Sequence, residues 1–171
     1  NGGFQLSKDK GFVVGVVSSH GHESGHIQVW DVLPEVEAIH VCTIAEDADL
    51  DAIAALSSKT VSKTKDLNEL LSRPGLDAVA VCVRPDLGPD GLRAVVSAGI
   101  PVLFDKPAST SAAAMRAVAD LARDKGVTAG AMFQWRRAAP IMEARRMLRE
   151  GAFGELWAVE SRVLTSQLRY R

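Results

Sequence analysis

Residues 12–21 read Phe-Val-Val-Gly-Val-Val-Ser-Ser-His-Gly, an apolar run that ends in polar residues and a glycine. Such a run predicts a strand that is buried on both faces of a sheet. Residues Ile27–Leu33 follow with helix-like content and are closed by Pro34. The segment therefore predicts a strand, a turn and a helix, in that order.

The same unit repeats along the chain and ends in a strand of a different sheet. Strands are expected at Val36–Ile44, around Val61, and at Ala78–Val83, Pro101–Phe104, Val127–Phe133 and Gly154–Leu164. Helices are expected at Asp49–Leu56, at Asp66–Leu71, around Leu92, Val95 and Val96, after a cap at Thr110, and from Pro140 to Gly151. Apolar strands that alternate with helices predict an α/β fold with a doubly wound parallel (Rossmann) sheet in the order 3-2-1-4-5-6.

Composition excludes several classes of protein. The chain has 171 residues, 47% of them hydrophobic and 24% charged, which suits one domain, or one domain plus a piece of another. A net charge of -1 argues against a nucleic-acid partner, although residues 133–171 carry eight Arg against four Glu and could attract an anion. No run reaches the roughly 18 apolar residues of a membrane helix, and residues 1–10 lack a signal-peptide segment. We expect a cytoplasmic protein with no membrane partner.

The two cysteines are expected to be small core residues. Cys42 and Cys82 lie in strand-like runs, and no other Cys or His stands at metal-ligand spacing around either one. In the expected strand order they flank the first strand, about 9.6 Å apart by two strand spacings. That separation is too large for a disulfide and agrees with a reducing compartment.

The first turn is where a dinucleotide's pyrophosphate would rest on backbone N–H groups at a helix start. The usual G-x-G-x-x-G positions are occupied here by Ser18, His20 and Glu23, and only Gly21 and Gly25 offer close backbone approach. Dinucleotide binding is therefore inferred mainly from architecture. The alternative is a closed structural turn.

The acidic residue that usually follows the second strand is also displaced. Ile44 stands at that place, with Glu46 and Asp47 just beyond it. Because this residue normally contacts the ribose, the sequence leaves the choice between NAD and NADP open.

The same turn contains His22-Glu23-Ser24-Gly25-His26, a literal H-E-x-x-H motif. In metalloproteases this motif places two zinc ligands and a glutamate base on one helix face. Ser24 and Gly25 disfavour a helix, and the segment directly follows a core strand. We therefore expect no metal, even with His20 as a third ligand, and interpret the histidines as polar residues of a loop that faces a ligand.

A lysine follows the fifth strand. The run Val102–Phe104 leads into Asp105-Lys106-Pro107. Ligands of open parallel sheets bind outside the carboxyl ends of the strands, which makes Lys106 a candidate for chemistry. The alternative is a solvated turn, because turns often recruit proline and polar residues.

Separate blocks of the chain carry a family resemblance. These are Asp77–Cys82, Ala98–Pro107, Phe133–Arg136 and Gly151–Leu156. Over about residues 11–165 the chain resembles the Gfo/Idh/MocA oxidoreductases. The resemblance implies an NAD(P)-binding Rossmann domain at 11–133 and, at 134–171, the incomplete start of an open-sheet α+β domain for substrate binding and dimerisation. It implies hydride transfer between NAD or NADP and a hydroxyl of a sugar, cyclitol or similar polyol.

The resemblance also implies roles for residues that match the family's motifs. Lys106, in Asp-Lys-Pro where Glu-Lys-Pro is usual, would be the catalytic residue beside the nicotinamide and would stabilise an alkoxide or relay a proton. Arg84-Pro85 matches a turn on the nicotinamide side, where the family commonly has Thr-Pro or Asn-Pro. The expected cofactor contacts are Ser18, His20, Gly21, His22, Glu46, Arg84, Pro85, Asp105, Lys106, Gln134 and Arg136.

The largest departure from the family is length. The family's usual catalytic Asp and His lie downstream of the expected strand Gly154–Leu164, so we expect this chain alone to be inactive. Trp157 and Leu164 on an incomplete sheet would expose apolar surface, which predicts self-association into a homo-oligomer, or poor solubility, unless a partner covers that surface. The alternative function is a non-catalytic binding or assembly module that has kept the fold.

Overall fold

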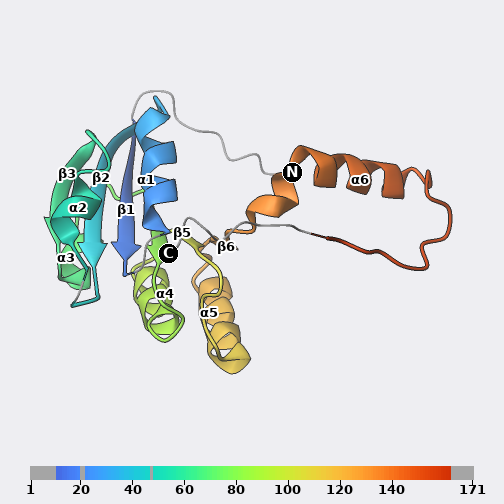
Figure 1. The fold of residues 1–171 in the computed structure, drawn as a ribbon. Coiled ribbons are helices and arrows are strands. Elements are labelled where there is room, and N and C mark those ends of the chain that lie inside the picture. The colour runs from blue at the N-terminus through green and yellow to red at the C-terminus, as the bar shows by residue number, and fades with distance from the viewer. Residues whose placement is uncertain (1–10, 20–21, 47, 163–171) are drawn as a thin grey trace. The chain divides into compact units, whose positions relative to one another are not determined.

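The computed structural model describes residues 11–19, 22–46 and 48–162. Six parallel strands form one sheet in the order β3-β2-β1-β4-β5-β6, which confirms the order expected from the sequence (Figure 1). The strands are β1 (Phe12–Ser18), β2 (Val36–Thr43), β3 (Thr60–Thr64), β4 (Ala78–Cys82), β5 (Val102–Phe104) and β6 (Ala129–Ala131). The sixth strand is shorter than the Val127–Phe133 expected.

Helices connect the strands. They are α1 (Glu23–Val32), α2 (Leu50–Ala54), α3 (Leu67–Leu71), α4 (Gly88–Ser97), α5 (Ala112–Asp124), the 3-10 helix η1 (Gln134–Arg137) and α6 (Ala139–Arg149). Asp49 and Asp66 cap α2 and α3 by accepting backbone N–H groups of the first turn. The cap of α5 is Ser111, which accepts from the Ala114 N–H, so the expected cap at Thr110 is wrong by one residue.

The core lies in two layers, one on each face of the sheet. Ile27 of α1 and Ile53 of α2 pack with β1 and β2 on one face, while Leu70, Leu92 and Val118 of α3, α4 and α5 pack on the other. Right-handed crossovers explain this division, because the chain moves outward from β1 to β3 and then returns to continue from β4 to β6. Burial of each such side chain contributes about 1.5–3 kcal/mol.

Helix α1 begins earlier than the sequence indicates. It starts at Glu23, although Ser24 and Gly25 have low helix propensity and the expected start was Ile27. Burial of His26 and Ile27 against the sheet outweighs that propensity, and the Glu23 carboxylate favours the positive end of the helix. The expectation of a non-helical H-E-x-x-H segment is therefore wrong from Glu23 onward.

The strand expected at Gly154–Leu164 is absent from the described part of that segment. Residues 154–162 are irregular and exposed, and Leu164 lies outside the described residues. A strand is stable only when a neighbour pairs with its backbone, and no described segment lies in register beside this one.

The chain divides into two compact units between Met132 and Phe133. The first unit contains the sheet, and the second contains η1 and α6. In the part of the chain that the structure describes, no helix combines the length and apolar character needed to cross a membrane.

Candidate functional site

The carboxyl ends of β1, β4 and β5 meet at one edge of the sheet. Ser18 stands beside Cys82, and the Arg84 N–H donates to the Ser19 hydroxyl at 2.8 Å. The Asp105 N–H donates to the Val81 carbonyl at 3.0 Å, which brings the end of β5 to the same place. The strand order reverses between β1 and β4, and such a switch point is where open α/β sheets bind ligands.

One carboxylate joins two of the segments at this edge. The Asp105 side chain contacts Nδ1 of His22, the residue that precedes α1, and its other oxygen accepts the Lys106 N–H at 2.7 Å. The Asp105 side chain is 12% exposed, whereas that of His22 is 63% exposed. Asp105 therefore ties the start of α1 to the Asp-Lys-Pro turn, while the Lys106 side chain remains exposed.

A close backbone contact fixes the segment that follows Lys106. A Cβ atom on Gly88, the first residue of α4, would lie 1.8 Å from the Ala108 carbonyl oxygen. Only glycine permits this approach. The Lys106-Pro107 peptide bond is cis. The start of α4 thus packs directly against the segment Lys106–Ala108.

Three buried polar atoms at the end of β1 and in the first turns of α1 have no hydrogen-bond partner among the described residues. They are Ser18 Oγ, Glu23 Oε2 and His26 Nε2. Their residues are 0%, 5% and 4% exposed. Buried polar groups without partners are uncommon, and one explanation is a ligand that would supply the missing bond.

The electrostatics of this cluster centre on His26. Burial lowers the pKa of His26 below its ordinary 6.5, and His22 lowers this pKa further, while Asp105 and Glu23 raise it. The side chains of His22, Glu23 and Asp105 therefore all act electrostatically on His26. The His26 ring also lies against the Trp30 ring, with centroids 6.0 Å apart.

Most of the residues at this edge fit a dinucleotide, and Glu23 is the exception. The start of α1 presents backbone N–H groups and a positive dipole, and the unpaired Ser18 hydroxyl can donate to a phosphate oxygen. Lys106 adds positive charge at the end of β5, whereas the Arg84 charge is paired with that of Asp86. The buried Glu23 carboxylate opposes that positive charge, because it brings negative charge to the helix end where a pyrophosphate would bind.

The other expected site residues lie in three places. Glu46 is exposed beyond β2. The Arg84 guanidinium contacts Asp86 at 3.3 Å, just after β4 and next to Pro85. Gln134 and Arg136 are exposed in η1 of the second unit. His20 and Gly21 lie outside the described residues.

Two residues at this edge were missed by the sequence analysis. The first is Ser19, whose hydroxyl accepts a hydrogen bond from the Arg84 N–H. The second is Thr43, the last residue of β2, whose Oγ1 donates to the Ser18 carbonyl at 3.1 Å. Thr43, rather than Ile44, therefore ends the second strand. A signal for Thr43 was available, because a polar residue that follows a buried apolar run often marks the strand end.

The two cysteines are core residues rather than reactive thiols. Both cysteines are free and buried, and burial raises the pKa of the Cys42 thiol to about 12 and that of Cys82 as well. Among residues 11–19, 22–46 and 48–162, no three His, Cys, Asp or Glu side chains are grouped to hold a metal ion.

Comparison with known proteins identifies the architecture. Residues 12–133 match the model of the oxidoreductase family with an NAD-binding Rossmann fold, Gfo/Idh/MocA. The uncharacterized oxidoreductase YhhX of Escherichia coli is 31% identical over 98 residues, which cover 57% of this chain and 28% of that protein.

Solved structures share the fold at lower identity. An NAD binding oxidoreductase from Klebsiella pneumoniae superposes with a TM-score of 0.69 at 20% identity, over 85% of this chain and 40% of that one. A scyllo-inositol dehydrogenase from Lactobacillus casei, with bound NAD(H) and scyllo-inositol, gives 0.72 at 16% identity, over 85% and 43%. This chain thus spans less than half the length of these proteins.

Proposed function

Because the chain belongs to the Gfo/Idh/MocA oxidoreductase family, we propose that it binds NAD at the carboxyl edge of its sheet. The observation that carries this proposal is the junction at Asp105, which joins the start of α1 to the turn that bears Lys106. The pyrophosphate would lie on the start of α1, and the nicotinamide would lie toward Lys106. NAD(H) bound to the scyllo-inositol dehydrogenase of the same fold supports this choice of cofactor.

We propose that Lys106 is the catalytic residue of the chain. When bound, the nicotinamide supplies or accepts the hydride of the reaction. Lys106 extends from a turn held by the Asp105 carboxylate and by the start of α4, so its ammonium group can approach a substrate hydroxyl. There it would donate a hydrogen bond to the substrate oxygen and so stabilise the alkoxide charge that develops on it.

The proposed substrate is a sugar, cyclitol or similar polyol. The scyllo-inositol bound by the solved relative supports this class. We further propose that the second unit contributes to substrate binding, with Gln134 and Arg136 contacting cofactor or substrate. Turnover requires further acid-base groups, which the family resemblance places in a substrate domain, so we expect this chain alone to bind cofactor without measurable oxidation.

We also propose self-association and a cytoplasmic location. Several apolar side chains of the second unit are exposed, including Trp135 at 66%, Trp157 at 88% and Val159 at 75%. A second copy of the chain could cover this surface, and sedimentation velocity at increasing protein concentration would detect it. Two free, buried thiols suit a reducing compartment.

Titration with NADH and NADPH tests the cofactor proposal. Tryptophan fluorescence is a suitable readout because Trp30 lies in α1 beside His26. We expect saturable binding below millimolar NADH. No change with either cofactor at millimolar concentration would exclude the proposal.

The buried Glu23 carboxylate supports a second candidate, a non-catalytic module that has kept the fold. Glu23 stands where the family usually has the third glycine, and its Oε2 has no partner among the described residues. On this account, a correctly folded chain binds neither NADH nor NADPH. Circular dichroism alongside the titration distinguishes this outcome from a misfolded sample.

A further inference from the structure

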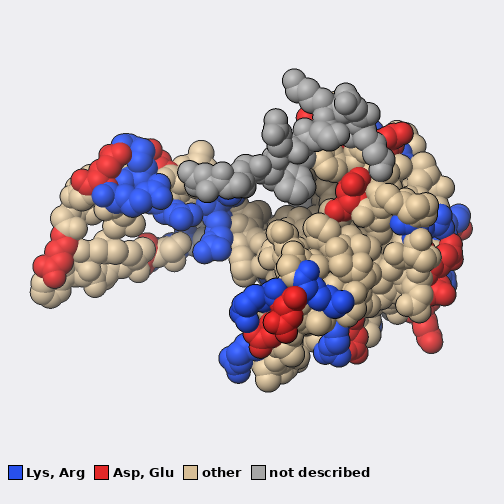
Figure 2. Space-filling view, turned by 180° about the vertical axis from the view of Figure 1, so that it is seen from behind, with Lys and Arg blue, Asp and Glu red and all other residues tan. Residues whose placement is uncertain are grey.

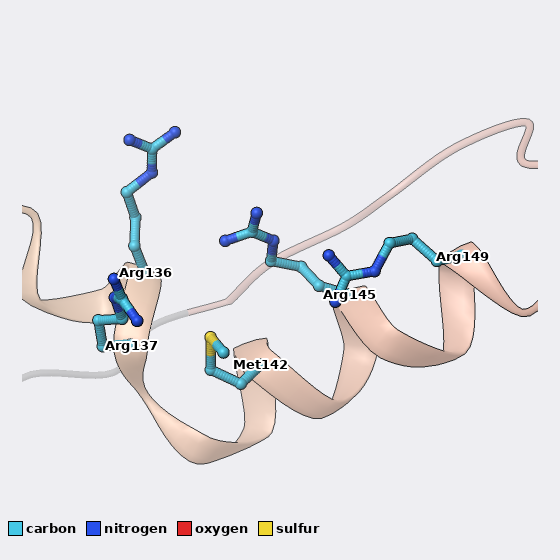
Figure 3. Close-up of a pocket in the computed structure, with 5 residues that line it drawn as sticks. All are labelled: Arg136, Arg137, Met142, Arg145 and Arg149. Carbon is cyan, nitrogen blue, oxygen red and sulfur yellow. The ribbon is translucent and has the colours of Figure 1, made fainter. Parts of the chain in front are cut away.

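Arginine side chains line a groove in the second unit. The groove has a volume of about 360 Å³ and is lined by Arg136, Arg137, Met142, Arg145 and Arg149. Figure 2 shows basic side chains gathered on the segment that holds α6. In Figure 3, Arg145 extends toward η1, and Arg149 reaches back along α6 toward Arg145.

The four arginines of the groove have no ion pair with any described residue. The nearby acidic residues, Glu143 and Glu150, are both bound by Arg146, whose guanidinium lies 2.6 Å from Glu143 Oε1. Arg146 therefore pairs with both carboxylates of α6 and is not among the residues that line the groove. The four groove arginines thus carry four positive charges, against one negative charge that Glu143 and Glu150 have in excess of Arg146.

The positive charges of the groove arginines repel one another, and a bound anion would offset this repulsion. Arg145 and Arg149 are four residues apart and occupy one face of α6, where like charges destabilise a helix by about 0.2–0.5 kcal/mol. Arg136 and Arg137 bring two more charges from η1 to the same groove. Arg136 has one favourable contact, with its guanidinium 6.0 Å from the Phe133 ring centroid.

We propose that this groove binds the phosphate group of a small molecule, held by Arg145 and Arg149 from α6 and by Arg136 and Arg137 from η1. A guanidinium group can bind two phosphate oxygens at once, and the positive charges of several arginines match the double negative charge of a phosphate group. The methionine gives the groove an apolar wall for a carbon skeleton. This inference goes beyond NAD binding, because Arg137, Arg145 and Arg149 have no part in the proposed cofactor site, and Arg136 alone is common to both.

The test is calorimetric titration of the chain with inorganic phosphate and with glycerol 3-phosphate, at fixed ionic strength. The double variant Arg145→Gln/Arg149→Gln should weaken binding at least tenfold, because glutamine keeps the helix propensity and removes both charges. The control is Arg116→Gln, which changes an exposed arginine of α5 and should change the affinity less than twofold.

The two ligands distinguish the source of the phosphate. Tighter binding of glycerol 3-phosphate indicates a phosphorylated small molecule, and equal affinity indicates that the phosphate group alone is recognised; both support the proposal. No binding of either ligand, or an equal loss in the α5 control, would overturn it. Because NADH titration reports on the first unit, failure of this proposal is distinguishable from failure of cofactor binding.

Discussion

At the scale of single residues, the site depends on Asp105. One of its oxygens contacts His22 and the other accepts the Lys106 N–H. The carboxylate thus links the turn that would hold a pyrophosphate to the lysine that would meet the substrate. A change at either partner should be measurable as a change in cofactor affinity.

The first prediction concerns His22. His22→Ala removes the contact with Asp105 and loosens the start of α1, so we expect the dissociation constant for NADH to rise about fivefold. The control is His40→Ala, which removes a histidine that contacts Ser62 between β2 and β3. Equal affinity of the His22 variant and the unmodified chain would show that the junction does not support the cofactor.

The second prediction concerns Glu23. Glu23→Gln removes a negative charge from the first turn of α1, so NADH should bind about threefold more tightly or better. Glu35→Gln makes the same charge change at an exposed position near the start of β2 and should leave affinity unchanged. Weaker binding by the Glu23 variant would mean that its carboxylate accepts a hydrogen bond from the ligand.

Sequence alone locates the lysine but not the cluster around it. Lys106 follows an apolar run, so the sequence predicts that it lies at the end of a strand. The burial of Glu23 is not visible, because glutamate is usually exposed and only the packing of α1 against the sheet covers it. The contact between His22 and Asp105 joins residues 83 positions apart, a separation that no local pattern spans.

At the scale of elements, the start of α4 holds the lysine turn in place, which gives a third prediction. Gly88→Ala places a Cβ 1.8 Å from the Ala108 carbonyl, so the free energy of unfolding should fall by about 2 kcal/mol or more. Gly91→Ala, in the same helix, meets only an ordinary contact of 3.6 Å with Val81. It should be neutral or stabilise by up to about 1 kcal/mol.

Urea unfolding followed by circular dichroism measures both glycine variants. If Gly88→Ala were as stable as Gly91→Ala, the close approach of α4 to the Lys106–Ala108 segment would be wrong.

The fourth prediction is a pH dependence that arises in α1. Burial lowers the pKa of His26, so below about pH 6.5 the unfolded chain binds more protons than the folded chain. The contribution of His26 to stability is therefore complete above pH 6.5 and is lost as the pH falls toward its lowered pKa. His40, whose pKa is also lowered by burial and by Arg73, acts in the same direction.

The free energy of unfolding, measured in urea between pH 7.5 and 5, should thus decrease with acidification. In His26→Gln the slope should be shallower, because it lacks one of the two histidines whose pKa is lowered by burial; adding His40→Gln should flatten the slope further. An unchanged slope in the single variant would show that His26 is not buried in its neutral form.

The elements themselves were predictable to different degrees. Long apolar runs such as Phe12–Val17 identified the buried strands, because only a two-faced core explains them. The start of α1 was misplaced, since tertiary packing overrides the low propensity of Ser24 and Gly25. The strand expected at Gly154–Leu164 is absent from residues 154–162, the described part of it, because alternation of side chains does not supply a pairing partner.

At the scale of the whole molecule, the two units differ in how they are stabilised. The first has a core on both faces of its sheet, whereas no side chain described in η1 or α6 is buried. The alternation of strands and helices made the sheet order predictable, because few connections satisfy right-handed crossovers. The sequence indicated the arginine groove only as an excess of positive charge in residues 133–171. The shape of the groove was not predictable, because it depends on how η1 packs against α6.

The most direct test of the central claim maps NAD onto the chain by the shifts of its backbone amide signals in solution NMR. We predict that NAD⁺ perturbs the amides of Ser19, Arg84 and Lys106 at the carboxyl edge of the sheet, and leaves that of Glu35, near the start of β2, unchanged. Shifts confined to other surfaces, or none at millimolar NAD⁺, would contradict the account.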